Sequence, residues 1–539
     1  MIHPYSHYPA RAARHWPDRI ALVDGERSRT YAELEERATA IASRLQSIGL
    51  EVGDRVAVLQ QNCIEYVESV IGIARAGGVL VPLLGALTPS EHAYVLIDSG
   101  SRFAIALSPE RIDSLRSACG ESITLLCFGG GRDSGRDEGR DEGRDEGRGS
   151  GDETIDLAAL SGPGEPEGLI IVDRPPSQLA QILYTSGTTG RPKGVTHSYA
   201  SVSAAMNFWA QKFDLGVEDR LLGQLALSHF CGRAMDSCWV AGARLVILPE
   251  ADPGEILRTI DVQKITMMLV VPTLLRLLLD HPDAARRNLD SLRAVVYAAS
   301  PAAPSLVRRA GERLGAVLHT GFGQTEAYGL NTFMGPEEHQ RALAADGKRL
   351  TSVGRECAAA QVRIRSEDGE DAANGEVGEI WVCAPWITPG FWQRPDLDEQ
   401  RLTNGWLRTG DLGLMDEDGY IFLADRREDM IITGGFNVYP AEIENCLVAH
   451  PAVIECGAFA VPDPKWGEAV NAAVVLREGD PVTPEQLLAF AKENLARFKV
   501  PKLIHVVEEL PRTAVGKVLR RELRAPFWEG KDQSVHGAE

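Results

Sequence analysis

The alternation of helix and strand patterns near the beginning of the chain restricts the fold more than any other feature. Residues 29–49 place apolar side chains at helical spacing, and Thr30 precedes them as a candidate N-cap. Residues 55–62 then have the pattern of a strand, residues 63–78 that of a second helix and residues 79–84 that of a buried strand. Strands that alternate with helices predict an α/β fold with a parallel sheet.

A change of pattern near residues 425–429 predicts a domain boundary. Before it, residues 378–386 and 419–425 resemble strands of a smaller sheet. After it come a strand, a glycine-rich turn and a helix that starts at Pro440. We therefore predict an N-terminal domain over residues 1–425 and a small α+β domain over residues 426–539.

Charge, cysteine content and apolar stretches exclude several classes of protein. The net charge of −20 argues against sequence-independent nucleic-acid binding, which needs clustered positive charge. The nine cysteines are scattered and form no C-x-x-C pair, which is typical of reduced thiols in the cytosol. The first residues lack the apolar core of a signal peptide. The most apolar stretch, residues 265–281, is interrupted by Pro272 and Arg276 and is too short to span a bilayer. We expect a cytoplasmic protein without a transmembrane segment.

Residues 129–153 repeat the unit Gly-Arg-Asp-Glu and contain no aromatic or aliphatic side chain. Nothing in such a segment offsets the entropy of ordering it, so we expect a disordered surface loop. A charged arm with a function of its own is the alternative.

The loop YTSGTTGRPKGV, Tyr184–Val195, combines glycines, hydroxyls and one lysine. Glycine lets the backbone approach a ligand closely, while hydroxyls, N–H groups and a lysine suit phosphate oxygens. The P-loop of NTPases requires lysine directly after the second glycine and a hydroxyl next. Here Lys193 follows Pro192 and precedes Gly194. We predict a phosphate-binding loop of another kind, with a flexible surface turn as the alternative.

Four further stretches carry isolated polar residues among glycines. They are TGFGQTEAYG (320–329), WLRTGDLG (406–413), DRREDMIITGGFN (425–437) and PRTAVGKVLRREL (511–523). Each alone has an ordinary explanation as a turn residue, a surface charge or a solvated lysine.

Together with the glycine-rich loop, their order resembles the adenylate-forming superfamily of acyl- and aryl-CoA ligases, firefly-type luciferases and peptide-synthetase adenylation domains. The resemblance covers about residues 31–523, and the tract at 129–153 is the main departure. It implies an α/β fold whose large N-terminal domain has αβαβα-layered sheets and a small β-barrel-like subdomain. A small, mobile α+β C-terminal domain follows.

The resemblance also implies a two-step reaction. A carboxylate attacks the α-phosphorus of ATP and gives acyl-adenylate and pyrophosphate, and a thiol then releases AMP. Lys517 matches the catalytic lysine, Thr325 the contact to the α-phosphate and Glu326 the Mg²⁺ ligand. The other matches to the nucleotide site are Thr185, Ser186, Gly187, Thr188, Thr189 and Lys193 at the phosphates, Ala299, Ser300, Pro301, Gly321, Phe322, Gly323 and Gln324 around adenine, and Asp411 and Arg426 at the ribose.

The C-terminal domain of this family rotates between the two steps. The pivot corresponds to Glu428, where many relatives carry Asp or Lys, a mild departure. Rotation would bring Gly434 and Gly435 to the acyl carbon, where they would line the tunnel for the thiol.

The acyl pocket of relatives lies near stretches that match residues 227–237, 295–300 and 321–330. The expected pocket residues are His229, Phe230, Arg233, Tyr297 and Tyr328. Amino-acid-activating relatives place an aspartate just after the aromatic residue that corresponds to Phe230. Here the nearest acid is Asp236, one or two helical turns on, which disfavours an α-amino acid.

For two of these expected pocket residues, the sequence leaves a second role open. Arg233 would pair with a second carboxylate of a dicarboxylic acid, or it faces solvent or a helix end. His229 lines the pocket or is an ordinary core histidine.

The form of residues 425–444 favours coenzyme A as the acceptor for a fatty or aryl acid. A carrier protein that acts in trans is the alternative. A nucleotide-binding protein without catalysis is disfavoured because Lys517, Glu326 and Asp411 are all present. A luciferase-like oxygenase would share every motif. A homodimer is compatible with all of these.

Overall fold

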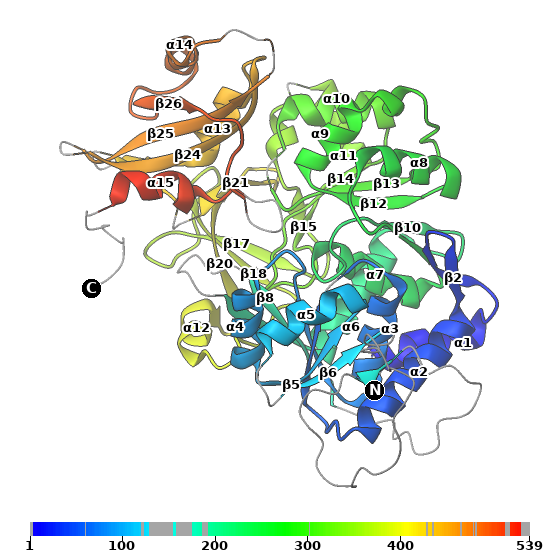
Figure 1. The fold of residues 1–539 in the computed structure, drawn as a ribbon. Coiled ribbons are helices and arrows are strands. Elements are labelled where there is room, and N and C mark those ends of the chain that lie inside the picture. Colours follow the sequence, from blue (N-terminus) through cyan, green and yellow to red (C-terminus); the bar gives the residue numbers. More distant parts are fainter. Residues whose placement is uncertain are drawn as a thin grey trace, which may run out of the picture. The chain divides into compact units, whose positions relative to one another are not determined.

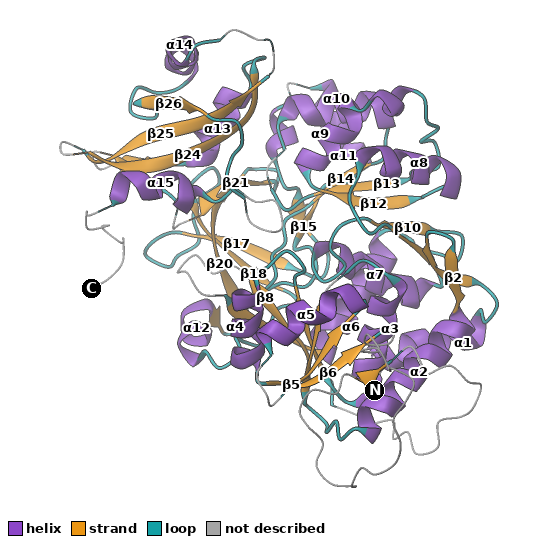
Figure 2. Cartoon of the chain, in the orientation of Figure 1, coloured by secondary structure: helices purple, strands orange, loops and turns teal. Residues whose placement is uncertain are grey.

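The computed structural model describes residues 4–59, 61–119, 123–128, 155–157, 175–185, 192–300, 302–345, 347–426, 429–433, 436–463, 466–477, 479, 482–512 and 518–529. The repetitive tract at 129–153 lies outside the described residues. The chain, drawn in Figures 1 and 2, divides into two compact units. The first unit contains residues 1–296, 323–329 and 385–399, and the second contains residues 297–322, 330–384 and 400–539.

The first unit contains a seven-stranded sheet in the order β7-β6-β5-β3-β4-β8-β9. Its strands are β3 (Arg55–Leu59), β4 (Val79–Leu83), β5 (Ser101–Ala106), β6 (Thr124–Cys127), β7 (Ile155–Asp156), β8 (Leu179–Thr185) and β9 (Lys193–Ser198). Strands β3 to β7 pair in parallel and only β8–β9 is antiparallel. The predicted alternation of strand and helix is therefore confirmed.

Local sequence signals explain the first helices. Helix α2 (Tyr31–Ser47) starts with a capping box, in which the Glu33 N–H donates to Thr30 Oγ1 at 3.1 Å and the Thr30 N–H donates to Glu33 Oε2 at 2.7 Å. Helix α3 (Ile64–Ala76) ends at Gly77, whose φ of 110° suits glycine. Both helices lie where the apolar spacing predicts them.

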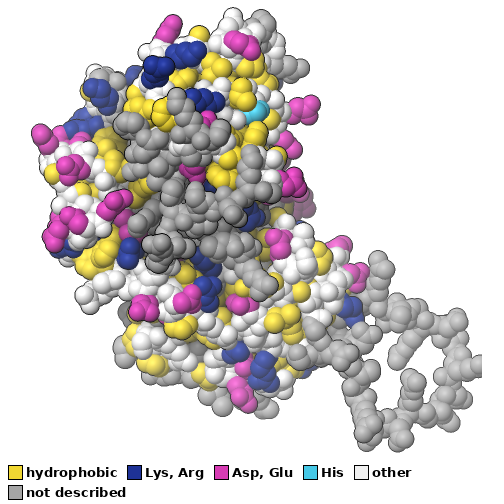
Figure 3. Space-filling model, turned by 90° about the vertical axis from the view of Figure 1, so that its left-hand side faces the viewer, with side chains coloured by type: hydrophobic (Ala, Val, Ile, Leu, Met, Phe, Trp, Pro, Cys, Tyr) yellow, Lys and Arg dark blue, Asp and Glu magenta, His cyan; other side chains and the backbone are white. Residues whose placement is uncertain are grey.

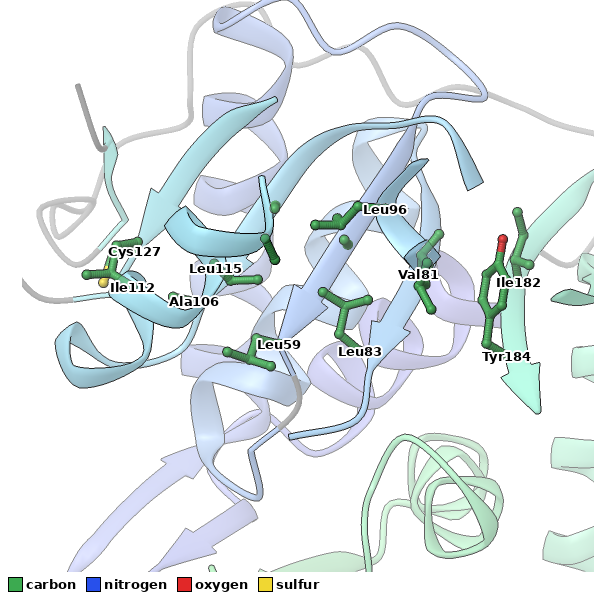
Figure 4. Close-up of a cluster of buried hydrophobic side chains, with 14 of the residues drawn as sticks. Leu59, Val81, Leu83, Leu96, Ala106, Ile112, Leu115, Cys127, Ile182 and Tyr184 are labelled. Carbon is green, nitrogen blue, oxygen red and sulfur yellow. The ribbon is translucent and has the colours of Figure 1, made fainter. Parts of the chain in front are cut away.

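A hydrophobic cluster fixes the sheet against helices α4 (Pro89–Ser99) and α5 (Pro109–Ala118). Figure 4 shows Leu59 on β3 and Leu83 on β4 in this cluster with Leu96 and Leu115 from the two helices. Full burial of each such side chain contributes about 1.5–3 kcal/mol. The cluster extends to Tyr184 on β8, so the strand that leads into the glycine-rich loop is part of the core.

A second sheet of the first unit places strands side by side in the order β13-β12-β10-β11-β1-β2. These strands are β1 (Ile20–Asp24), β2 (Arg27–Thr30), β10 (Arg220–Gly223), β11 (Arg244–Ile247), β12 (Met267–Val270) and β13 (Ala294–Tyr297). The helices of this part are α1 (Pro4–His15), α6 (Tyr199–Lys212), α7 (Phe230–Ala241), α8 (Pro253–Gln263) and α9 (Pro272–Asp280). The apolar stretch at 265–281 is thus a strand and a helix that begins at Pro272.

The second unit begins with α10 (Pro304–Leu314), β14 (Leu318–Thr320) and α11 (Pro336–Ala344). An antiparallel sheet follows in the order β17-β18-β20-β19, and β21 pairs with β20. Its strands are β17 (Gln361–Arg365), β18 (Gly378–Cys383), β19 (Leu402–Thr403), β20 (Trp406–Met415) and β21 (Ile421–Arg426). The sequence predicts a small β-barrel-like subdomain within residues 1–425, and this sheet lies at residues 361–426.

The C-terminal part of the second unit is a small α+β module with its own core. Its elements are β22 (Ile431–Thr433), β23 (Phe436–Val438), α13 (Pro440–Val448), β24 (Val453–Asp463), β25 (Gly467–Leu476), α14 (Pro484–Asn494), β26 (Leu503–Val506) and α15 (Arg520–Trp528). Arg520 joins α15 to α13 through Glu444 at 2.8 Å and also contacts Asp429 at 3.1 Å. The boundary at residues 425–426 falls within the second unit and stays a prediction.

Surface charge, cysteine pairing and helix hydropathy are three further features of the described residues. On the face drawn in Figure 3, acidic and basic side chains are interspersed. No disulfide joins the cysteines whose side chains the structure describes. Within the same described ranges, no helix has the length and hydropathy needed to cross a bilayer.

Candidate nucleotide and acyl site

The glycine-rich loop begins and ends at two directly opposed residues. Thr185 closes β8, Lys193 opens β9, and the two are register partners in the antiparallel pair. Residues 186–191 lie outside the described residues, so the structure leaves the expected roles of Ser186, Gly187, Thr188 and Thr189 untested. Gly194 is required by packing, since a Cβ there would lie 2.9 Å from the Ile182 side chain. The strand pair thus places one hydroxyl and one ammonium at the two ends of a loop predicted to bind phosphate.

The segment 323–329 carries Thr325 and Glu326 and is held at its backbone. The Thr325 carbonyl contacts His197 Nε2 at 2.8 Å, and the Glu326 carbonyl accepts from the Thr388 N–H at 2.7 Å. The Tyr328 N–H donates to the Trp386 carbonyl at 3.1 Å. The side chains of Thr325 and Glu326 are only half-buried. The backbone is therefore fixed while these two side chains remain accessible to a ligand.

The Glu326 side chain fits the predicted role as a Mg²⁺ ligand. It is half-buried, and no hydrogen bond or ion pair of its carboxylate occurs within the described ranges. The described part of the chain contains no group of three or more His, Cys, Asp or Glu side chains that could hold a metal ion by themselves. Mg²⁺ is commonly bound by one or two carboxylates together with substrate phosphates and water. One accessible carboxylate suits an ion that arrives with a nucleotide.

A buried hydrogen bond joins segment 323–329 to helix α7. The Tyr328 hydroxyl donates to Asp236 Oδ2 at 2.7 Å, and Asp236 is 1% exposed. The ring of His197 lies 4.9 Å from that of Tyr328. Asp236 is on the helix that begins at Phe230, as predicted. The sequence pattern pointed to neither His197 nor this pairing, because nothing local links β9, α7 and a loop so far apart in the chain.

The other expected pocket residues divide into described and undescribed side chains. His229 is half-buried and is the N-cap residue of α7, without a side-chain cap bond. The side chains of Phe230 and Arg233 lie outside the described residues. Tyr297, in the second unit, is 3% exposed, and its hydroxyl lies 2.8 Å from His339 Nε2. Burial raises the pKa of Tyr297 and lowers the pKa of His339, so both side chains are neutral near pH 7.

The residues expected around adenine follow strands β13 and β14. Ala299 is exposed and has a φ of 76°, a conformation that costs a non-glycine residue about 1–3 kcal/mol. A Cβ at Gly321 would lie 2.4 Å from the Thr332 carbonyl oxygen, so only glycine fits. The Phe322 N–H donates to Thr332 Oγ1 at 2.9 Å. Strain and tight packing at strand ends are typical of ligand sites. Ser300 is exposed beside Ala299, Pro301 lies outside the described residues, and Gly323 and Gln324 open segment 323–329.

The two residues expected at the ribose are cross-strand partners. Asp411 on β20 lies opposite Arg426 on β21 in the antiparallel pair. The Asp411 N–H donates to Thr409 Oγ1 at 3.1 Å, which fixes the backbone beside its carboxylate. The side chain of Arg426 lies outside the described residues, as do all of Lys517, Glu428, Gly434 and Gly435. The register nevertheless places the backbone positions of Asp411 and Arg426 directly opposite each other on the sheet.

Comparison with known proteins gives one consistent result. A family model described as AMP-binding enzyme matches residues 9–392, and one described as AMP-binding enzyme C-terminal domain matches residues 442–517. The chain is 34% identical to the medium/long-chain-fatty-acid–CoA ligase FadD8 of Mycobacterium tuberculosis (strain ATCC 25618 / H37Rv), across 98% of this chain and 91% of that protein. It is 33% identical to a feruloyl-CoA synthase of Amycolatopsis sp, across 96% and 98%.

A solved structure agrees with these relatives. The amide bond synthetase McbA from Marinactinospora thermotolerans superimposes with a TM-score of 0.84 at 31% identity, over 96% of this chain and 99% of that chain. The match of the first family model covers more than half of the chain. The chain therefore belongs to the family of AMP-binding enzymes.

Proposed function

We propose that this protein is an ATP-dependent acid–thiol ligase that forms AMP. In the first half-reaction a carboxylate oxygen attacks the α-phosphorus of ATP, and pyrophosphate leaves. In the second, the thiol of coenzyme A attacks the acyl carbon, and AMP leaves with that oxygen. Membership of the AMP-binding family and two relatives that are CoA ligases support this reaction.

The observation that carries the proposal furthest is the arrangement of the nucleotide residues in pairs. Thr185 is opposite Lys193, and Asp411 is opposite Arg426. The first pair has the hydroxyl and the cation that suit phosphate. The second has the carboxylate that accepts hydrogen bonds from two ribose hydroxyls.

The first half-reaction joins two anions, so cationic groups must hold them together. We assign Lys193 and the hydroxyls of residues 185–189 to the β- and γ-phosphates and Thr325 to the α-phosphate. Glu326 would hold Mg²⁺, which would supply charge neutralisation at the phosphates. Lys517 would bridge the carboxylate and ATP. Its loss should stop adenylation and largely spare thioester formation.

The thiol step uses the C-terminal domain that follows residue 425. We assign Glu428 to the hinge and Gly434 and Gly435 to the passage of the pantetheine arm. If so, Glu428→Pro should impair one half-reaction more than the other. Equal loss of both would refute the hinge assignment.

The acid is proposed to be a fatty or aryl monocarboxylic acid. FadD8 is a fatty-acid–CoA ligase and the Amycolatopsis relative is a feruloyl-CoA synthase. The Asp236 carboxylate accepts a hydrogen bond from Tyr328, which argues against its binding a substrate ammonium. A dicarboxylic acid paired with Arg233 is the alternative, and Arg233→Glu tests it. Unchanged turnover of every acid would remove it.

A product assay tests the function and names the acid. The purified protein is mixed with Mg·ATP and alkyl acids of increasing length, aryl acids and dicarboxylic acids, each with and without coenzyme A, and products are identified by mass. Acyl-CoA and AMP from one class of acid would support the proposal. Acyl-adenylate without thioester would indicate a carrier protein as acceptor. Neither product from any acid would contradict the proposal.

The proposed setting is the cytoplasm. The chain has scattered cysteines, and the described ones form no disulfide, which suits a reducing compartment.

A further inference from the structure

We propose that Asp98 and Tyr94 on helix α4 are positioning residues for the adenylation half-reaction. They fix both stems of the glycine-rich loop, which are the chain segments next to Thr185 and next to Lys193. This inference rests on the proposed function. Tyr94 and Asp98 are four residues apart on α4 and share one face of it. Neither is expected to touch a substrate.

The first stem is fixed through Tyr184, the residue before Thr185. Its hydroxyl donates to Asp98 Oδ2 at 2.6 Å, and the residue is 8% exposed. Burial, with the hydrogen bond to Asp98 as a second cause, raises the pKa of Tyr184, so the hydroxyl keeps the proton that it donates. Figure 4 shows Tyr184 beside Ile182 in the hydrophobic cluster that also contains Leu96 of α4.

The second stem is fixed at Pro192, the residue before Lys193. The Tyr94 hydroxyl lies 3.2 Å from the Pro192 carbonyl oxygen and 3.3 Å from Asp98 Oδ1. Its single proton is therefore shared between a carbonyl and a carboxylate.

Trp392 supports the same stem from another part of the first unit. Its N–H donates to the Gly194 carbonyl at 2.7 Å, and its ring Nε1 donates to the Asp98 carbonyl at 3.0 Å. Tyr94 and Asp98, one turn apart on α4, are thus connected to both sides of the loop, either directly or through Trp392.

This arrangement links the separation of Thr185 and Lys193 to α4. Proline cannot donate a backbone hydrogen bond, so the β8–β9 pair cannot continue through Pro192 as a donor. The side chains of α4 supply a restraint there in place of the strand ladder. Geometry at a reacting phosphate is demanding, since a displacement of about 1 Å can lower the rate about 100-fold.

The half-reactions separate positioning from general stability. Only the first half-reaction involves the β- and γ-phosphates, because pyrophosphate has left before the thiol attacks. Acid-dependent ATP–pyrophosphate exchange measures the first, and conversion of synthetic acyl-adenylate and coenzyme A to acyl-CoA measures the second. A loss confined to exchange would be a positioning effect that destabilisation does not produce.

The variants are Tyr184→Phe, Tyr94→Phe and Asp98→Asn, with Tyr31→Phe as a matched control. Tyr31 is 1% exposed, and its hydroxyl donates to the Ala243 carbonyl at 2.6 Å, so its loss removes a comparable bond without a link to the loop. Thermal melting of all four verifies that they fold. Asp98→Asn keeps one acceptor oxygen and serves if a phenylalanine variant does not fold.

We expect the first two variants to lower kcat/KM for ATP in exchange by about tenfold to 100-fold and to leave thioester formation within about twofold. Asp98→Asn should have a smaller effect, and Tyr31→Phe should leave the ratio of the two activities unchanged. Equal loss of both activities, or loss of neither, would overturn the positioning role. Absence of exchange in the unmodified protein would instead refute the proposed function.

Discussion

The buried hydroxyls of Tyr328 and Tyr297 give a matched test of the electrostatics of the site. Both residues are nearly inaccessible, at 5% and 3% exposed, and each hydroxyl has a hydrogen bond of similar length, 2.7 Å for Tyr328 and 2.8 Å for Tyr297. The partners differ, because Tyr328 donates to the carboxylate of Asp236 whereas Tyr297 pairs with the imidazole of His339. Burial lowers the pKa of His339, so that partner is neutral at pH 7.

This difference sets the expected magnitudes. A hydrogen bond to a charged group contributes about 1.5–3 kcal/mol and one between neutral groups about 0.5–1.5 kcal/mol. Tyr328→Phe also leaves Asp236, which is 1% exposed, with one bond fewer in a buried setting. We therefore expect Tyr328→Phe to destabilise its unit by at least about 1 kcal/mol more than Tyr297→Phe destabilises its own.

Urea unfolding at pH 7.5 measures this difference in destabilisation. A separate signal is recorded for each unit, because a chain of two compact units need not unfold in one step. Tyr328→Phe should also lower pyrophosphate exchange, since Tyr328 lies two residues from Glu326 in the same held segment. An equal or smaller destabilisation for Tyr328→Phe than for Tyr297→Phe would refute the reasoning that the hydrogen bond to the Asp236 carboxylate is the stronger of the two.

The remaining predictions concern pH and the metal. Burial lowers the pKa of His339, so below pH ~6.5 the unfolded state binds more protons than the folded state. The stability of the fold should therefore fall as the pH drops through this range. His339→Gln should reduce this dependence of stability on pH in thermal melts at pH ~5 to ~8. Burial would raise the pKa of Asp219, but its hydrogen bonds from Arg293, Gly216 and Thr266 outweigh this and lower it. Its contribution is therefore present above pH ~4 and lost in acid, and Asp219→Asn should reduce stability at pH 7 by about 1–3 kcal/mol but by less at pH 3. Glu326→Gln should raise the Mg²⁺ concentration for half-maximal exchange by about tenfold or more; an unchanged requirement would remove Glu326 as the ligand.

Local signals in the sequence predicted the elements that depend on local physics. The capping residue Thr30 and the apolar spacing after it place helix α2, and Pro440 marks the start of α13. The prediction of an α/β fold with a small C-terminal domain is confirmed by these elements and by the solved relatives. The prediction of an AMP-forming acyl-CoA ligase is confirmed by the family match and the related CoA ligases.

Tertiary contacts were the part that the sequence could not predict. The single strand expected before α13 is a hairpin of β22 and β23, because a three-residue strand carries too few residues for a period to be recognised. His197, Asp98 and Tyr94 had no motif of their own. Their roles follow from hydrogen-bond partners that are distant in the sequence. The separation is 86 residues for Asp98, 128 residues for His197 and 98 residues for Tyr94.

Other expectations stay predictions because their side chains are outside the described residues. This holds for Lys517 and Glu428 and for the pocket side chains Phe230 and Arg233. The half-reaction assays and the panel of acids address each of them.

The path of one oxygen atom tests the central claim most directly. The acid found with the panel is labelled with ¹⁸O at both carboxyl oxygens, and AMP and acyl-CoA are collected after turnover with Mg·ATP and coenzyme A. An acyl-adenylate requires that one labelled oxygen leaves with AMP and the other stays in the thioester. AMP with one ¹⁸O is the predicted result. Unlabelled AMP, or label in inorganic phosphate with ADP as the nucleotide product, would contradict the account.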